Sequence, residues 1–292
     1  MKGATDNLTL AFKSLWGAST VPFCAGAKPA FGHPEFDALS AKISQLCAIG
    51  SSGVLHGPNG SGKSYLINYL LDSKLSEKQF KVLVLTHSSL TCSDLLRALS
   101  LELQIRPKFR RSDTVAAITE AWKTLGSRWP VLIVEEAQNL SAAALEELRL
   151  LSCARLDKVP FSLVLVGDNG LLASLKLGVH APLRSRLGYC LQLSPLNAQQ
   201  SRQYVEHGLH SSSIHANPFQ HEALELLIQA SGGLPRTINH LTQRSMEAAA
   251  AQDNVEVTAA HVQVGIDRLP WLVNLLQEHQ RCLISRKQPS DS

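Results

Sequence analysis

The sequence predicts an α/β fold, in which a parallel sheet is flanked by helices, followed by a small domain made of helices alone. Short apolar runs alternate with helix-like segments of ten or more residues through the first two thirds of the chain. One run, PVLIV, is apolar at every position, which is typical of a strand buried on both faces of a sheet. After Pro195 such runs stop, and helical segments follow one another.

Apolar periodicity and helix-breaking residues indicate the elements in chain order. Residues 34–49 should form a helix, because Phe36, Leu39 and Ile43 recur at three- and four-residue steps. Pro107 ends a later helix, since proline lacks the amide hydrogen that the helix requires. Strands are expected at residues 53–57, 81–87, 130–136 and 161–168, alternating with helices at 63–75, 92–105, 112–129 and 141–156. Four further helices are expected at residues 197–211, 219–232, 235–252 and 258–269.

These elements divide the chain into four parts. Residues 1–33 are rich in Gly, Ala and Pro and are expected to form an irregular N-terminal arm. Residues 34–194 should form the α/β core, and residues 195–269 a helical lid domain interrupted by Gly-Gly-Leu-Pro and Asp-Asn breaks. Residues 270–292 form a tail with an apolar stripe, which is more often part of a core than of an interface.

Composition places the chain among soluble proteins with a substantial core. It has 292 residues, of which 45% are apolar, and a formal charge of +4, which permits binding to an anionic surface without requiring it. The six cysteines lie far apart and lack metal-ligand spacing, so inert thiols in a reducing cytoplasm are expected. No stretch approaches the ~18 consecutive apolar residues of a membrane span. We therefore expect a cytoplasmic protein without a membrane partner.

A glycine-rich motif carries the clearest chemistry in the sequence. GPNGSGKS fits GxxxxGK[ST], with an expected strand before it and an expected helix after it. The glycines let backbone N–H groups surround phosphates, Lys63 reaches the outer phosphates, and Ser64 supplies a hydroxyl ligand for magnesium. ATP and Mg²⁺ are therefore the expected cofactors. The expected nucleotide-binding segment comprises Gly57, Pro58, Asn59, Gly60, Ser61, Gly62, Lys63, Ser64 and Tyr65.

Two adjacent glutamates follow the apolar run of VLIVEEAQNL. Glu135 takes the position usually given to a magnesium-linked aspartate, and Glu136 the position that polarises the attacking water. A glutamate displaces the carboxylate by ~1.5 Å, and shifts of that order can slow phosphoryl transfer. Magnesium in such sites keeps several waters and tolerates the displacement, so ATP binding should be intact and hydrolysis slow. A strand end with two solvated acids is the alternative.

Further polar residues can respond to the nucleotide. Asp168 ends the apolar run of FSLVLVGDN and can sense the γ-phosphate, although a strand-terminating turn explains it equally well. Arg184 or Arg186 in PLRSRL can reach a neighbouring subunit's nucleotide as an arginine finger, and a surface salt bridge is the alternative. Arg236 begins a helix of the lid domain and can contact phosphate when the domains close, or serve only as a helix-start arginine.

A basic cluster, RPKFRR, surrounds Phe109 and can bind a nucleic-acid backbone, although a solvated loop is the more frequent outcome of such a composition. The histidines show no metal-ligand spacing, and no acid partner is placed for a Ser/His pair, which argues against metalloprotease and serine hydrolase chemistry. The expected DNA-binding residues are Lys108, Arg110 and Arg111 of this cluster, with Ser89 and Thr91 of the polar turn after the second strand.

These motifs in this order resemble the AAA+ superfamily, and more closely the ExeA-like ATPases, which include transposition helpers of the TnsC, TniB and MuB type. The stretches that carry the resemblance are GPNGSGKSYL, VLIVEEAQNL with LEELRLLS, LVLVGDNGLL, APLRSRLGYCLQLSPL and ASGGLPRTINHL, spanning about residues 31–269. The sequence departs from the family pattern at Glu135, and also at Asp168-Asn169, where the family often has Gly-Gln-Pro.

The resemblance implies a P-loop AAA+ core with a helical lid, and ATP bound between subunits of a ring or helical filament. It assigns Asp168 to the first sensor position, Arg184 or Arg186 to catalysis in trans, and Arg236 to the lid sensor.

Transposition members of this group form ATP-dependent oligomers that coat DNA and recruit or activate a DDE transposase. We therefore expect a DNA-binding regulator of transposition that assembles on the backbone of duplex DNA and is disassembled by hydrolysis. Secretion-linked members usually carry a membrane helix and a cell-wall-binding domain after the lid, and neither is found in this sequence, which favours the DNA branch. An ATPase of secretion or envelope assembly that never touches DNA is the alternative function.

Overall fold

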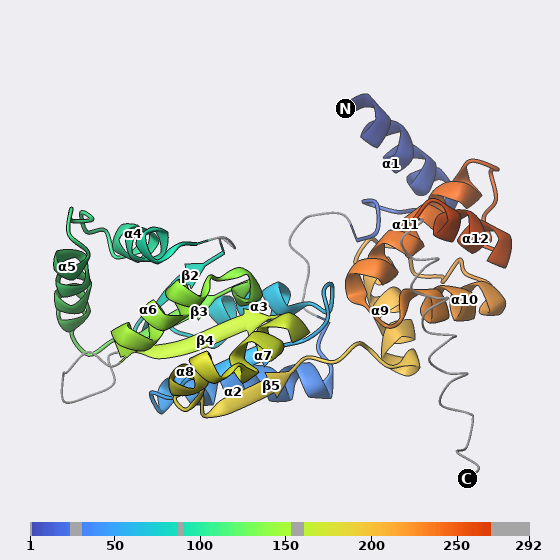
Figure 1. Ribbon diagram of the computed structural model, residues 1–292. Helices are drawn as coiled ribbons and strands as arrows, with labels where there is room; N and C mark the ends of the chain where they lie inside the picture. Colours follow the sequence, from blue (N-terminus) through green and yellow to red (C-terminus); the bar gives the residue numbers. More distant parts are fainter. Residues whose placement is uncertain (1, 24–30, 87–89, 153–160, 270–292) are drawn as a thin grey trace, which may run out of the picture. The chain divides into compact units, whose positions relative to one another are not determined.

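The computed structural model describes residues 2–23, 31–86, 90–152 and 161–269 (Figure 1). The chain divides into two compact units. Residues 32–194 form the core unit, and residues 195–292 together with residues 1–31 form the helical unit. The described N-terminal residues 2–23 therefore belong to the same unit as residues 195–269, and the predicted tail at residues 270–292 lies outside the described residues.

The core unit contains a parallel sheet with the strand order β2-β3-β4-β1-β5. Every described pairing in the sheet is parallel, which confirms the predicted α/β fold. The last strand, Tyr189–Gln192, was not predicted, because Leu191 is its one buried residue and an apolar run is missing. The strands are β1 (Gly53–His56), β2 (Phe80–Leu85), β3 (Trp129–Val134), β4 (Ser162–Gly167) and β5 (Tyr189–Gln192).

Helices cover both faces of this sheet. Val131 and Ile133 of β3 pack in one apolar cluster with residues of α2 and α3, whereas Leu132 and Val134 pack in a second cluster with residues of α4 to α8. Alternate side chains of one strand thus enter two cores, which explains why the strand is apolar at every position. The helices are α2 (Pro34–Ala48), α3 (Lys63–Ser73), α4 (Cys92–Glu102), α5 (Arg111–Lys123), α6 (Ala142–Ser152), α7 (Asn169–Lys176) and α8 (Ala181–Arg184), with short 3-10 turns η1 (Ala137–Asn139) and η2 (Gly178–His180).

The helical unit includes a helix where an irregular arm was expected. Phe12 of α1 is fully buried in the apolar core of this unit, and Trp16 donates its ring N–H to the Val255 carbonyl at 2.7 Å. These contacts join residues far apart in the sequence, so the local Gly, Ala and Pro content did not reveal them. The helices of the unit are α1 (Lys2–Trp16), α9 (Ala198–His210), α10 (His221–Ser231), α11 (Pro235–Ala250) and α12 (Ala259–Asp267).

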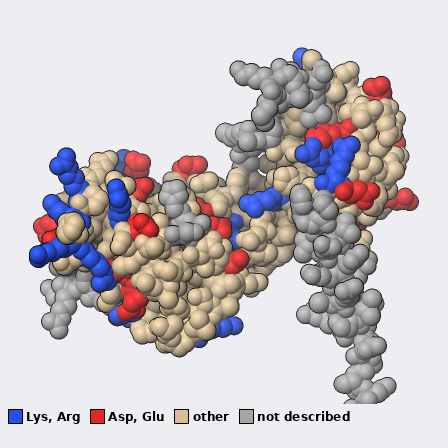
Figure 2. Space-filling view, turned by 45° about the horizontal axis from the view of Figure 1, so that its top comes forward, with Lys and Arg blue, Asp and Glu red and all other residues tan. Residues whose placement is uncertain are grey.

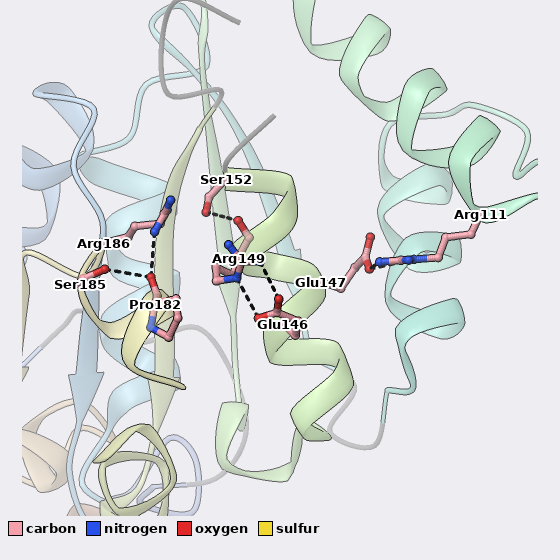
Figure 3. Close-up of polar contacts among 8 residues, drawn as sticks. All are labelled: Arg111, Glu146, Glu147, Arg149, Ser152, Pro182, Ser185 and Arg186. Atoms are coloured by element: carbon pink, nitrogen blue, oxygen red, sulfur yellow. Dashed lines mark hydrogen bonds and ion pairs between the residues drawn. The ribbon is translucent and has the colours of Figure 1, made fainter. Parts of the chain in front are cut away.

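A buried carboxylate joins three helices of the core unit. Glu147 of α6 has a side chain only 1% exposed, and it accepts a hydrogen bond from Nε of Arg111 at 2.9 Å, with Nη2 of the same arginine on the same oxygen (Figure 3). Cys92, the first residue of α4, donates its thiol to this oxygen at 3.2 Å. Burial, and then the Glu147 carboxylate, raise the pKa of the Cys92 thiol. Glu147 thereby ties the starts of α4 and α5 to α6.

Removing the Arg111 guanidinium should destabilise the core unit. Arg111→Ala leaves the Glu147 carboxylate buried without its cation, which destabilises the folded state. Because the Arg111 side chain is half exposed, water can enter its place and reduce that cost in part. We expect the free energy of unfolding to fall by roughly 1–3 kcal/mol, measured by urea denaturation. Arg110→Ala is the matched control, since the Arg110 side chain makes no cap hydrogen bond, and it should change the value by less than about 0.5 kcal/mol. Equal effects of the two substitutions would contradict this role of Glu147.

Candidate nucleotide site

Three neighbouring strands of the sheet end beside one another and bring distant motifs together. The strand order places β1 between β4 and β5, and β4 between β3 and β1. His56, the last residue of β1, pairs with Gly167, the last residue of β4, and Gly57 donates its N–H to the Gly167 carbonyl at 3.2 Å. Ligands of open parallel sheets bind outside the carboxyl ends of the strands. The motifs after β1, β3 and β4 therefore meet at one candidate site.

The glycine-rich loop after β1 has a backbone that requires glycine. A β-carbon at Gly57 would lie 2.3 Å from the Leu193 carbonyl oxygen, and Gly62 has φ of 101° at the start of α3. The Ser61 hydroxyl is buried in the loop, with no hydrogen-bond partner among the described residues. Together with the N–H groups at the start of α3, this hydroxyl suits the oxygens of a phosphate group. Tyr65, one turn further on, is exposed.

Lys63 lies inside the same loop. Its side chain is buried, and the ammonium group donates to the Gly57 carbonyl at 2.8 Å and to the Pro58 carbonyl at 3.1 Å. Both acceptors belong to the loop that the phosphates would occupy. The positive charge is therefore held where it can stabilise the outer phosphates of a nucleotide.

Ser64 and Glu135 meet across the site. The Ser64 hydroxyl donates to Oε2 of Glu135, and Glu135 is buried while its own N–H donates to the Leu85 carbonyl of β2 at 2.8 Å. A hydroxyl and a carboxylate side by side are oxygen donors of the kind that Mg²⁺ takes in phosphate sites, where substrate and water complete the shell. The two residues thus fit the cation, and the longer side chain of glutamate still reaches the hydroxyl.

Glu136 is held by a residue that sequence reasoning missed. Its backbone is left-handed, with φ of 52°, and η1 begins directly after it. The Gln138 side chain donates from Nε2 to the Glu136 carboxylate at 2.8 Å and accepts from the Asp168 N–H at 3.3 Å. Only its place two residues after Glu136, in VLIVEEAQNL, could have drawn attention to it. Gln138 therefore connects the end of β3 with the end of β4.

Asp168 has a structural task at the start of α7. Its carboxylate accepts from the Gly170 N–H at 2.8 Å and so caps the helix. A turn-forming role of this kind was the alternative to phosphate sensing in the sequence analysis. The backbone of Asp168 lies in the candidate site, and a sensing role for the residue stays a prediction.

None of the three predicted arginines takes part in the described contacts of the site. Arg184, at the end of α8, is exposed and donates to the Leu175 carbonyl at 2.8 Å. Arg186 is also exposed and donates to the Pro182 carbonyl at 2.8 Å (Figure 3). Arg236 is an exposed residue in the first turn of α11, which belongs to the helical unit. Their roles in catalysis between subunits and in the lid stay predictions.

The predicted DNA-binding residues lie around the starts of α4 and α5. Lys108 and Arg110 are exposed beside a fully exposed Phe109, and Figure 2 shows Lys and Arg side chains gathered at the end of the core unit that carries these helices. Thr91 caps α4 by accepting from the Asp94 N–H at 3.3 Å. Arg111 is engaged with Glu147, which gives it a structural role that was not predicted. Ser89 lies outside the described residues.

Comparison with known proteins agrees with this reading of the core unit. Residues 50–175 match a family model described as an AAA domain. The chain is 29% identical over 256 residues to general secretion pathway protein A of Aeromonas hydrophila, a match that covers 84% of this chain and 46% of the relative. The chain thus spans about half the length of that relative. The family match and the fold support an ATPase of the AAA type in the core unit. The match to the secretion relative supports the ExeA-like part of the resemblance.

Solved structures share the same fold at low sequence identity. ORC1 of Aeropyrum pernix, solved in complex with DNA, has a TM-score of 0.64 at 16% identity over 82% of this chain and 66% of its own. Cdc6p of Pyrobaculum aerophilum gives 0.63 at 17% identity, over 84% and 68%. The RuvB Holliday junction branch migration motor of Thermotoga maritima gives 0.55 at 20% identity, over 82% and 70%.

Within the part of the chain that the structure describes, no helix has the length and apolar character needed to cross a bilayer.

Two substitutions should separate nucleotide binding from hydrolysis. Lys63→Ala removes the buried ammonium group and should abolish binding of a fluorescent ATP analogue. Glu136→Gln keeps the size of the side chain but cannot accept a proton, so binding should persist while phosphate release falls by about 100-fold or more. A Glu136→Gln variant that hydrolyses ATP at the wild-type rate would exclude Glu136 as the general base.

Proposed function

We propose that this protein is an ATP-driven switch, which binds ATP with Mg²⁺ at the candidate nucleotide site and hydrolyses it slowly to ADP and phosphate. The observation that carries this proposal is the convergence of Lys63, the Ser64–Glu135 pair and Glu136 at the carboxyl ends of β1 and β3, the two strands that flank β4. The donor and acceptor types in this set match those that phosphoryl transfer requires.

Each residue has a distinct task in the proposed reaction. Backbone N–H groups of the loop and Lys63 stabilise charge on the phosphates, and Ser64 with Glu135 holds Mg²⁺, which supplies charge neutralisation when bound. Glu136 accepts the proton of the attacking water. Arg184 or Arg186 acts on the nucleotide of a neighbouring subunit in a ring or helical filament, and Arg236 responds from the lid.

The first candidate setting is regulation of DNA transposition in the cytoplasm. ATP-bound subunits would assemble on the backbone of duplex DNA and recruit or activate a DDE transposase, and hydrolysis would disassemble them. Exposed Lys108 and Arg110 support this setting, because they offer cations for the phosphates of the duplex backbone. The ORC1 structure, which shares the fold and was solved in complex with DNA, also supports this setting.

The second candidate setting is secretion or envelope assembly, with a protein partner in place of DNA. The match to general secretion pathway protein A favours it, since that relative aligns with most of this chain. In this setting the basic cluster is a solvated loop, and the switch acts on another protein.

A DNA titration distinguishes the two settings. We expect duplex DNA to bind more tightly with a non-hydrolysable ATP analogue than without nucleotide, in a fluorescence anisotropy assay. The double variant Lys108→Ala/Arg110→Ala should weaken binding at low salt and reduce the slope of log affinity against log salt by about 0.9 for each lost phosphate contact. Lys123→Ala is the control, because Lys123 pairs with Glu120 on the surface of α5.

Two results together would exclude the DNA setting and leave the protein-partner setting. The first is a DNA affinity that changes neither with nucleotide nor with the double substitution, and the second is a rate of ATP turnover that does not change when DNA is added.

A further inference from the structure

We propose that Gln138 is a positioning residue for ATP hydrolysis. Its side chain orients the Glu136 carboxylate and couples that orientation to the turn between β4 and α7. This inference rests on the proposed hydrolysis and adds to it a residue through which two strand ends act together.

The two hydrogen bonds of Gln138 fix the orientation of its amide. The Glu136 carboxylate can only accept a hydrogen bond, and the Asp168 N–H can only donate one. With Nε2 at 2.8 Å from the carboxylate and Oε1 at 3.3 Å from the backbone nitrogen, each end of the amide faces the partner that its chemistry requires. A flipped amide would lose both interactions.

The amide also packs closely against the turn after β4. A β-carbon at Gly167 would lie 2.7 Å from Oε1 of Gln138, and one at Gly170 would lie 3.8 Å from its Cβ. The side chain therefore fits against backbone on both sides of Asp168. A shift of this turn, such as contact between Asp168 and a bound nucleotide would cause, must move the Gln138 amide as well.

Burial alone does not fix the orientation of the Glu136 carboxylate. Its side chain is only half buried and has several rotatable bonds, while its left-handed backbone places it at a sharp turn. The hydrogen bond from Gln138 selects one orientation of the carboxylate. Since a base misplaced by about 1 Å can lose about 100-fold in rate, the choice of orientation affects turnover directly.

Substitution of Gln138 should change turnover and leave nucleotide binding intact. For Gln138→Ala we expect kcat to fall about 10- to 100-fold, while KM and the affinity for a fluorescent ATP analogue stay within about threefold of the wild type. Gln79→Ala is the matched control, because Gln79 is an exposed glutamine of the core unit just before β2. It should leave kcat unchanged.

Gln138→Glu provides a second variant of the same size. It places a carboxylate against Glu136, and two adjacent carboxylates resist ionising together. The acidic limb of the pH profile of kcat should therefore move to higher pH by about one unit. A purely structural glutamine would lower the amount of folded protein without moving this limb.

The outcomes are distinguishable. If the wild type fails to hydrolyse ATP, the proposed function itself is wrong. If the wild type is active and Gln138→Ala keeps its kcat, or Gln138→Glu keeps the wild-type pH profile, the positioning role is overturned while the ATPase stands. Should Gln138→Ala fail to fold, the pH profile of Gln138→Glu decides.

Discussion

The parallel register of three central strands is the constraint on which the candidate site depends. Because β3, β4 and β1 run the same way and lie side by side, their carboxyl ends share one edge of the sheet. Residues 71 positions apart, Ser64 and Glu135, can then form a hydrogen bond. The glutamate in place of an aspartate is accommodated, since its carboxylate still reaches the hydroxyl beside the phosphate loop.

A short segment of chain links this edge of the sheet to the helix that anchors the basic cluster. The turn η1 carries Gln138, and α6 begins only a few residues later and bears Glu147. Glu147 in turn holds Arg111 and Cys92 at the starts of α5 and α4. The segment that positions the proposed base is thus continuous with the helix that anchors the basic cluster. Packed helices and a buried ion pair thus connect the candidate nucleotide site with the basic cluster.

Local sequence signals predicted the sheet and the phosphate loop, whereas contacts between distant residues escaped them. The run Val131 to Val134 indicated a central strand because burial on both faces demands apolar residues throughout. β5 was missed because an edge strand needs few of them, and α1 because the partners of Phe12 lie at the other end of the chain. Gln138 and Glu147 carry no motif of their own, and their importance comes only from what the fold places beside them.

The central claim is that Glu135 and Ser64 form the magnesium side of an ATP site. A magnesium titration of ATP turnover tests it most directly, comparing the wild type with Glu135→Asp and Glu135→Ala. Because magnesium in such sites keeps several waters and tolerates a small displacement of the carboxylate, the aspartate variant should need about the same magnesium concentration as the wild type and turn over at an equal or faster rate. The alanine variant should need at least about tenfold more magnesium. An alanine variant with the wild-type magnesium dependence would contradict the claim.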